Sequence, residues 1–197
     1  MTELLTSIAV CFDLPILDWI QANLQSGILD KIMPIVTVFG DGGIFWIAWS
    51  VLLLLFPKTR KTGLGMGCAL IMGLLLCTLT LKPLVARIRP YDLQWELYGR
   101  EILLLTGKMH DFSFPSGHTI ASFEAATVLL KNSRKMGIPA MILAIAIAFS
   151  RLYLYVHYPT DVLVSIILGV ILAFIGDALA AKVAPKLSPR KKGKFES

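Results

Sequence analysis

The sequence predicts an all-α protein: a membrane-embedded bundle of about six transmembrane helices, preceded by a helix in the membrane interface. Hydrophobic residues make up 56% of the 197 residues and charged residues only 16%, and the mean hydropathy is +0.72. This composition is far more apolar than that of a soluble domain. Several uncharged runs approach the ~20 residues that a helix needs to cross a bilayer, and no long polar segment is available to build a soluble domain.

The N-terminal segment predicts a helix that lies on the membrane. Residues 12–24 mix apolar and polar positions at helical spacing. Pro15 suits an early helical position, and Trp19 is typical of a membrane interface. We therefore expect residues 1–27 to form an N-terminal interfacial helix.

The spans begin after this helix. Residues 28–39 are apolar but contain Pro34, and at about 1.5 Å per residue they would cover only ~18 Å of the bilayer. The sequence leaves open whether residues 12–39 form a full span. Five further spans are predicted at residues 44–56, 63–81, 119–130, 136–156 and 159–181. We therefore expect five crossings, or six if the first segment also spans.

The positive charges predict how the bundle is oriented. Three basic clusters lie at residues 58–61, 131–135 and 182–194. They fall on one side when the spans alternate, and cytoplasmic loops carry an excess of Lys and Arg. We therefore expect residues 183–197 to form a basic cytoplasmic tail. The connection 83–115 and the bend 156–160 would then lie on the outer face of the cytoplasmic membrane. Charge placed at the ends of apolar runs indicates lipid headgroups as partners, and no nucleic acid.

The first polar segment on the predicted outer side is Lys82-Pro83-Leu84-Val85-Ala86-Arg87-Ile88-Arg89-Pro90. Lys82 and Arg89 are two helical turns apart, so they would project from one face if the helix continues past Pro83. Arg87 would then point elsewhere. Alternatively, these cations reach lipid headgroups from the end of a helix.

The second segment, Pro115-Ser116-Gly117-His118, opens an apolar helix. With Pro115 near the first helical position, the helix would present unpaired backbone N–H groups to the outer surface, and such a terminus binds anions. Ser116 could instead be only a helix cap. His118 could be a general acid, although a single interfacial histidine is also unremarkable.

The third segment runs from Ser150 to Asp161 between two long apolar runs. Arg151 supplies a fork of donors that suits phosphate oxygens. His157 can be a nucleophile, and Asp161 could hold its other ring nitrogen in the required tautomer. Pro159 fits the first turn of a helix, so His157 is expected at a bend between two helices. The alternative is an interfacial ion pair of Arg151 and Asp161 beside a packed histidine.

Together the three segments offer three cations, a helix N-terminus, two histidines and one carboxylate. This combination suits a tetrahedral dianion, whose oxygens the cations and N–H groups hold while one imidazole attacks and the other protonates the leaving oxygen. The sequence contains no run of metal ligands and no Gly-rich nucleotide loop. We therefore expect neither a metal nor a cofactor.

The three segments resemble the three-part signature of the type 2 phosphatidic acid phosphatase superfamily. The matching parts are Lys82-x6-Arg89-Pro90, Pro115-Ser116-Gly117-His118 and Ser150-Arg151-x5-His157-x3-Asp161, in the same order and spacing. The resemblance covers roughly residues 40–182. The superfamily includes lipid phosphate phosphatases, phosphatidylglycerophosphate and undecaprenyl diphosphate phosphatases, and soluble vanadium haloperoxidases.

The resemblance implies a role for each matching residue. His157 would attack phosphorus to form a phosphohistidine, Asp161 would orient it, and His118 would protonate the leaving alcohol and then activate water. The groups that would bind the phosphoryl oxygens are Lys82, Arg89, Ser116, Gly117 and Arg151. The family also requires no metal.

The expected function is therefore hydrolysis of the phosphomonoester or diphosphate of a membrane lipid, with residues 28–182 as the phosphatase domain. Phosphatidylglycerophosphate, phosphatidate and undecaprenyl diphosphate share the reacting group, and the sequence selects none of them. It also leaves the oligomeric state open. Two alternatives are a phosphatase of a small soluble ester and a non-catalytic carrier of anionic lipid.

Three of the carboxylates outside the signature carry an expectation of their own. Glu124 falls within an apolar helix, where we expect it to be protonated or paired, with a structural hydrogen bond favoured over catalysis. Asp41 is predicted on the active face, where it could steady a cation, and Asp177 should pair with a basic neighbour near the cytoplasmic end. An aromatic belt is predicted from Tyr153, Tyr155 and Tyr158.

Overall fold

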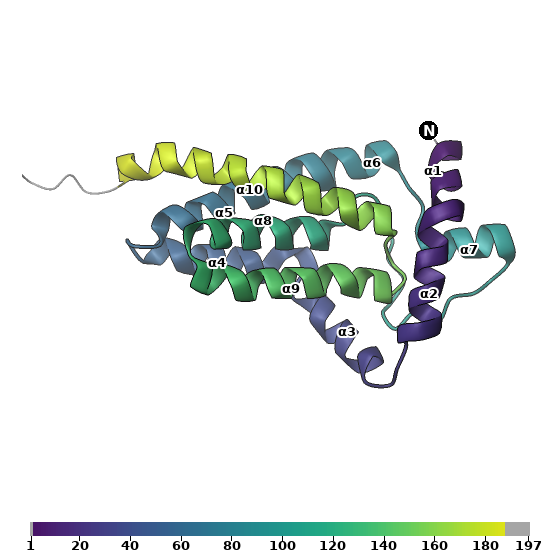
Figure 1. Cartoon of the computed structure of the whole chain (residues 1–197). Helices are drawn as coiled ribbons and strands as arrows, with labels where there is room; N and C mark the ends of the chain where they lie inside the picture. Colours follow the sequence, from purple (N-terminus) through teal and green to yellow (C-terminus); the bar gives the residue numbers. More distant parts are fainter. Residues whose placement is uncertain (1, 188–197) are drawn as a thin grey trace, which may run out of the picture.

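The computed structural model describes residues 2–187, which contain helices and no strand. A continuous helical segment opens the chain and lies across one end of a helix bundle (Figure 1). It consists of α1 (Thr2–Ile8), the π-helical stretch η1 (Ala9–Asp13) and α2 (Leu14–Leu24). The helix predicted from residues 12–24 is therefore present, and the helical segment that contains it begins at Thr2.

The bundle follows this helix. Its elements are α3 (Leu29–Val38), the 3-10 turn η2 (Asp41–Gly43), α4 (Ile44–Leu55), α5 (Arg60–Gly73), the π-helical η3 (Leu74–Leu81), α6 (Lys82–Val85), α8 (Gly117–Asn132), α9 (Arg134–Tyr153) and α10 (Pro159–Leu187). The short helix α7 (Pro90–Tyr98) lies beside the N-terminal helix (Figure 1). Helix α8 packs against α5, α9 and α10 and is buried along most of its length, so it forms the centre of the bundle.

Four helical stretches of the described chain are long and apolar enough to cross a membrane. They are Leu29–Leu55, Arg60–Tyr98, Arg134–Tyr153 and Pro159–Ala184. Helix α8 runs alongside them with 16 residues, or about 24 Å. The predicted all-helical membrane fold is confirmed. Four of the five expected spans fall largely within these stretches, and the fifth coincides with α8, which is shorter than the candidate spans. Residues 28–39 join α4 in a single stretch through η2.

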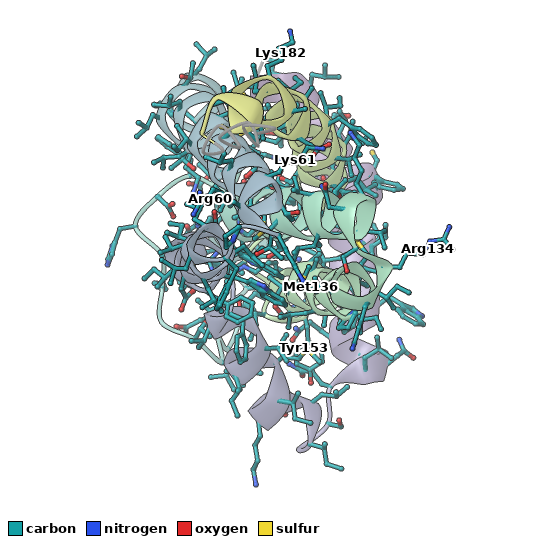
Figure 2. All side chains as sticks on the ribbon, turned by 90° about the vertical axis from the view of Figure 1, so that its left-hand side faces the viewer. Arg60, Lys61, Arg134, Met136, Tyr153 and Lys182 are labelled. Atoms are coloured by element: carbon teal, nitrogen blue, oxygen red, sulfur yellow. The ribbon has the colours of Figure 1, made fainter. Side chains whose placement is uncertain are left out.

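The basic clusters share one end of the bundle. The starts of α5 and α9 and the last turns of α10 lie together there, at the left of Figure 1. Figure 2 looks onto this end and labels Arg60, Lys61, Arg134 and Lys182. Residues 188–197 of the predicted basic tail lie outside the described residues.

At the same end, Asp177 pairs with basic residues as expected. Its carboxylate lies 2.7 Å from Nζ of Lys131 and 3.8 Å from Nζ of Lys61, and it accepts a hydrogen bond from Asn132 at 2.9 Å. These contacts tie α10 to α5 and α8 at the end of the bundle that carries the basic clusters.

The predicted aromatic belt is wrong. Tyr153, Tyr155 and Tyr158 are all buried, in a cluster with apolar residues of the N-terminal helix. The hydroxyl of Tyr155 donates to Asp18 in α2 at 2.9 Å, and that of Tyr153 donates to Asp30 in α3 at 2.6 Å. These tyrosines therefore attach the N-terminal helix and α3 to the bend after α9.

Candidate active site

Lys82 and Arg89 of the first segment come together through a bend in the chain and do not lie on one helix. Helix α6 ends at Val85, and Ala86 adopts a left-handed conformation with φ 48°. Arg89 is extended, as is typical of a residue before proline, and α7 begins at Pro90. The expectation that the helix continues to Arg89 is therefore wrong. Lys82 and Arg89 nevertheless converge, because both contact Asp111 in the connection between α7 and α8.

Arg89 is held firmly by the backbone around it. Its Nε donates to the carbonyl of Asp111 at 2.9 Å, and its Nη1 donates to the carbonyl of Val156 at 2.6 Å. The same Nη1 lies 3.4 Å from Nε2 of His157. The side chain is only 2% exposed, so a phosphate bound here would meet a donor that is already oriented.

Asp111 was not singled out in the sequence, yet it bridges the two cations. One carboxylate oxygen lies 2.5 Å from Nη2 of Arg89, and the other accepts a hydrogen bond from Nζ of Lys82. Burial raises the pKa of Asp111, but hydrogen bonds from Lys82 and Arg89 outweigh it and lower the pKa to about 2. The carboxylate is therefore ionised at neutral pH.

His157 lies in the bend between α9 and α10, as predicted. The side chain is buried, with Nε2 near Arg89 and Nδ1 3.6 Å from Oδ2 of Asp161. Burial lowers the pKa of His157 well below 6.5, and the positive charges of Arg89 and Arg151 lower it further. The imidazole is therefore neutral at pH 7. A proton on Nδ1, the nitrogen that lies toward the carboxylate, would leave the electron pair of Nε2 available as a nucleophile.

Asp161 is held by two partners behind His157. Its Oδ2 accepts from the backbone N–H of Tyr158 at 3.1 Å, and its Oδ1 lies 2.5 Å from Nη1 of Arg87. The other terminal nitrogen of Arg87 lies 2.7 Å from Oδ2 of Asp13 in the N-terminal helix. Asp13, Arg87 and Asp161 are all buried. Arg87 does point away from the phosphate cations, as expected, but it is part of the support for His157.

The second segment forms the N-terminus of α8, which begins at Gly117 rather than at Pro115. Ser116 is its N-cap: its hydroxyl accepts from the N–H of Thr119 at 3.5 Å and from the Thr119 hydroxyl at 3.0 Å. The N–H of Ser116 donates to Ser165 of α10 at 2.8 Å. The cap interpretation of Ser116 is therefore confirmed.

His118 follows in the first turn of α8. Its Nε2 lies 2.6 Å from Oδ1 of Asp41 in η2. Asp41 lies on the active face as expected, and its partner there is a histidine, so it steadies a cation only when His118 is protonated. Gly40 also packs on this ring, since a Cβ there would lie 2.7 Å from Cδ2 of His118.

Arg151 is fully buried in the last turn of α9. Its Nη1 donates to the hydroxyl of Thr37, and its Nη2 lies 3.4 Å from the sulfur of Met109. Its Nε has no hydrogen-bond partner among the described residues. The alternative of an ion pair between Arg151 and Asp161 is wrong, because Asp161 pairs with Arg87.

A cavity of about 480 Å³ joins these groups to the apolar side of the bundle. Its polar end is lined by Lys82, Arg89, Asp111, Gly117, His118 and His157. Its apolar end is lined by Ile47, Val51, Leu54, Leu70, Ile71 and Leu74 of α4, α5 and η3. Ser116, Arg151 and Asp161 lie behind this lining. Five of the eight predicted site residues thus line the polar end of the cavity, and the other three do not line it.

Glu124 also lines the cavity. It is buried, and its Oε1 has no hydrogen-bond partner in the described chain. A Cβ on Gly73 would lie 2.2 Å from this oxygen. The expected structural hydrogen bond is therefore not made by Oε1. Among residues 2–187, no group of three or more His, Cys, Asp or Glu side chains is placed to hold a metal ion.

Comparison with known proteins identifies the family. A sequence model of the PAP2 superfamily matches residues 62–181. The undecaprenyl-diphosphatase of Sulfolobus acidocaldarius is 33% identical over 152 residues, covering 77% of this chain and 70% of that protein. The crystal structure of LpxE from Aquifex aeolicus aligns with a TM-score of 0.72 at 24% identity, covering 84% of this chain and 94% of that one.

A second crystal structure is that of a transmembrane PAP2-type phosphatidylglycerolphosphate phosphatase from Bacillus subtilis. It aligns with a TM-score of 0.63 at 25% identity, covering 87% of this chain and 82% of that one. The matched residues 62–181 include all three signature segments, whereas Asp13 lies outside them. The resemblance drawn from the signature is thereby confirmed: the chain belongs to the PAP2 superfamily.

Proposed function

We propose that the protein hydrolyses the phosphomonoester or diphosphate of a membrane lipid through a phosphohistidine at His157. Family membership makes the chain an integral membrane lipid phosphatase. The observation that carries the more specific proposal is the cavity, which has cations and imidazoles at one end and an apolar wall at the other. A cavity with this polarity suits an amphiphile whose phosphate binds at the polar end while its chain lies between helices.

In the first step, Lys82 and Arg89 hold the phosphoryl oxygens and the neutral Nε2 of His157 attacks phosphorus. The P–Nε2 bond forms as the bond from phosphorus to the leaving oxygen breaks, and protonated His118 donates its proton to that oxygen. Burial and the positive charge of Arg151 lower the pKa of His118 to about 4, so the protonated form depends on Asp41 and on the negative charge of the bound phosphate. Asp161 stabilises the positive charge on the phosphorylated ring from the side of Nδ1. Arg151 lies behind the cavity, and its positive charge stabilises the negative charge of the phosphoryl group.

In the second step, water attacks the phosphohistidine. His118, now neutral, takes a proton from this water, and the P–Nε2 bond breaks to release inorganic phosphate. The step returns His157 to its neutral form and His118 to its protonated form, so both are ready for the next turnover. Asp41 orients the His118 ring throughout, through the 2.6 Å contact with its Nε2.

We further propose that the reaction takes place at the outer face of the cytoplasmic membrane. The polar end of the cavity lies at the end of the bundle opposite to the basic starts of α5 and α9. Because basic loops favour the cytoplasmic side, the cavity would open to the extracytoplasmic side. A lipid could then enter sideways with its chain still in the bilayer.

This assignment predicts that activity rises with the length of the substrate's chain. In detergent, a series of n-alkyl phosphates should show kcat/KM increasing by up to about fourfold per methylene, because each buried CH2 contributes ~0.8 kcal/mol. The increase should stop once the apolar end is filled. Phosphate release measured across this series, and across several lipid phosphates, tests the proposal. Equal rates for lipid phosphates and short soluble esters would contradict it.

A matched pair of variants locates the chain-binding surface. Ile71 lines the cavity and is 60% exposed, whereas Ile167 on α10 is 59% exposed and does not line it. Ile71→Trp should lower kcat/KM for long-chain substrates and leave short esters unchanged. Ile167→Trp, an equal change in bulk, should affect neither.

A further inference from the structure

We propose that Asp111 is an internal counter-anion of the phosphate site, which selects terminal phosphates and rejects phosphodiester lipids. Its carboxylate bridges Lys82 and Arg89, so a substrate must displace it to reach both cations. This inference rests on the proposed function and adds a residue that determines which headgroups bind.

The geometry shows which donors the carboxylate occupies. Two nitrogens of Arg89 donate to the carbonyls of Asp111 and Val156, so these bonds hold the guanidinium in place. The third nitrogen, Nη2, lies 2.5 Å from the Asp111 carboxylate and makes a longer contact, at 3.4 Å, with the carbonyl of Phe112. Lys82 Nζ has no other ion-pair partner among the described residues. The carboxylate therefore occupies Nη2 of Arg89 and Nζ of Lys82, the two donors that a ligand in the cavity would need.

Rotation of one side chain is sufficient to release these donors. The backbone on either side of Asp111 is fixed, because the hydroxyl of Tyr91 bonds the N–H and the carbonyl of Met109 and the N–H of Ser113 donates to the carbonyl of Arg87 at 2.8 Å. The Asp111 side chain is 55% exposed. It can therefore turn into solvent without movement of the surrounding chain.

The charges decide which ligand can make the exchange. The two cations carry two positive charges, of which Asp111 neutralises one. A phosphodiester headgroup brings a single negative charge, so it gains no charge advantage over a carboxylate that is already tethered in place. A terminal phosphate carries about −1.5 to −2 at neutral pH, and a diphosphate carries more. Only these ligands gain electrostatically from the exchange.

Such a filter matters because the surrounding bilayer presents phosphodiester headgroups at very high local concentration. Without Asp111, an anionic phospholipid could occupy Lys82 and Arg89 and compete with the substrate. Specificity of this kind is obtained by disfavouring the wrong ligand as much as by favouring the right one. Asp111 would therefore weaken phosphate binding somewhat in exchange for selectivity.

The test is phosphate binding to the full-length protein in detergent, measured by isothermal titration with inorganic phosphate at constant ionic strength. Asp111→Asn keeps the size and removes the charge, so it should lower the Kd for phosphate by about two- to fivefold, which corresponds to the upper part of the range for partly exposed ion pairs. Asp111→Ser should do the same. Glu101→Gln removes an equal charge from the same connection, where Glu101 is exposed and does not line the cavity, and should change nothing.

Inhibition by phosphatidylglycerol in mixed micelles is the second measurement. The Asp111→Asn protein should be inhibited at severalfold lower mole fraction than the unmodified protein. If phosphate binds no tighter to either Asp111 variant, or if phosphatidylglycerol inhibits both proteins equally, the inference is wrong. Phosphate titration involves no turnover, so this result is independent of whether His157 acts as the nucleophile.

Discussion

His157→Ala is expected to abolish hydrolysis, lowering kcat by at least roughly 10⁴-fold, because no other side chain replaces the nucleophile. The shorter contacts of Lys82 and Arg89 do not involve the imidazole, so phosphate binding should remain within a few fold. Turnover is measured as phosphate release from a lipid diphosphate in detergent, and binding by titration with inorganic phosphate.

The control for this variant is His110→Ala. His110 is exposed, lies in the connection between α7 and α8 and does not line the cavity. Its loss should leave kcat unchanged. If His157→Ala retained activity, covalent catalysis at this residue would be wrong, and a carrier that uses only the cations would account better for the site.

Arg87→Met is expected to cause the largest loss of stability, about 3–5 kcal/mol, together with loss of activity. Arg87 lies between two buried carboxylates, Asp13 and Asp161, and removing it leaves two uncompensated negative charges in a dry site. Its guanidinium also lies 3.7 Å from the ring centre of Tyr158, so that contact is lost as well. Thermal unfolding in detergent measures the effect.

Two further variants make this prediction specific. Arg100 contacts Asp18 at 3.0 Å with both side chains substantially exposed, so Arg100→Met should cost less than ~1 kcal/mol. Adding Asp13→Asn to Arg87→Met should recover part of the lost stability, because one of the two unpaired charges is removed. An Arg87→Met protein as stable as Arg100→Met would show that the buried pairs do not support the bend.

The helices and much of the site could be predicted because local sequence determines them. Uncharged runs identified the spans, Pro159 marked the start of α10, and Ser116 marked the start of α8. His157 was correctly expected in the bend between two helices. In each case the signal lies within a few residues of the feature that it predicts.

The features that could not be predicted have no signal in the neighbouring residues. Ala86 turns the chain out of its helix although alanine is the strongest helix former, so no local signal predicts this turn. Asp13 meets Arg87 across 74 residues, and only the fold brings them together. The tyrosines near His157 appeared suited to lipid but are covered by the N-terminal helix. An ionisable residue shortly after a long apolar run is nevertheless a signal for a functional partner, and the position of Arg87 after the run 63–81 provides that signal.

The central claim is that distant segments form one phosphate site in which His157 takes the phosphoryl group. The most direct test is to mix the protein with a lipid diphosphate labelled with ³²P on its terminal phosphate, quench the reaction in alkali within milliseconds, and map the label by peptide mass spectrometry. The account predicts an alkali-stable, acid-labile label on the peptide that contains His157, absent from His157→Ala. Label on any other residue, or full turnover with no labelled protein at any time, would contradict it.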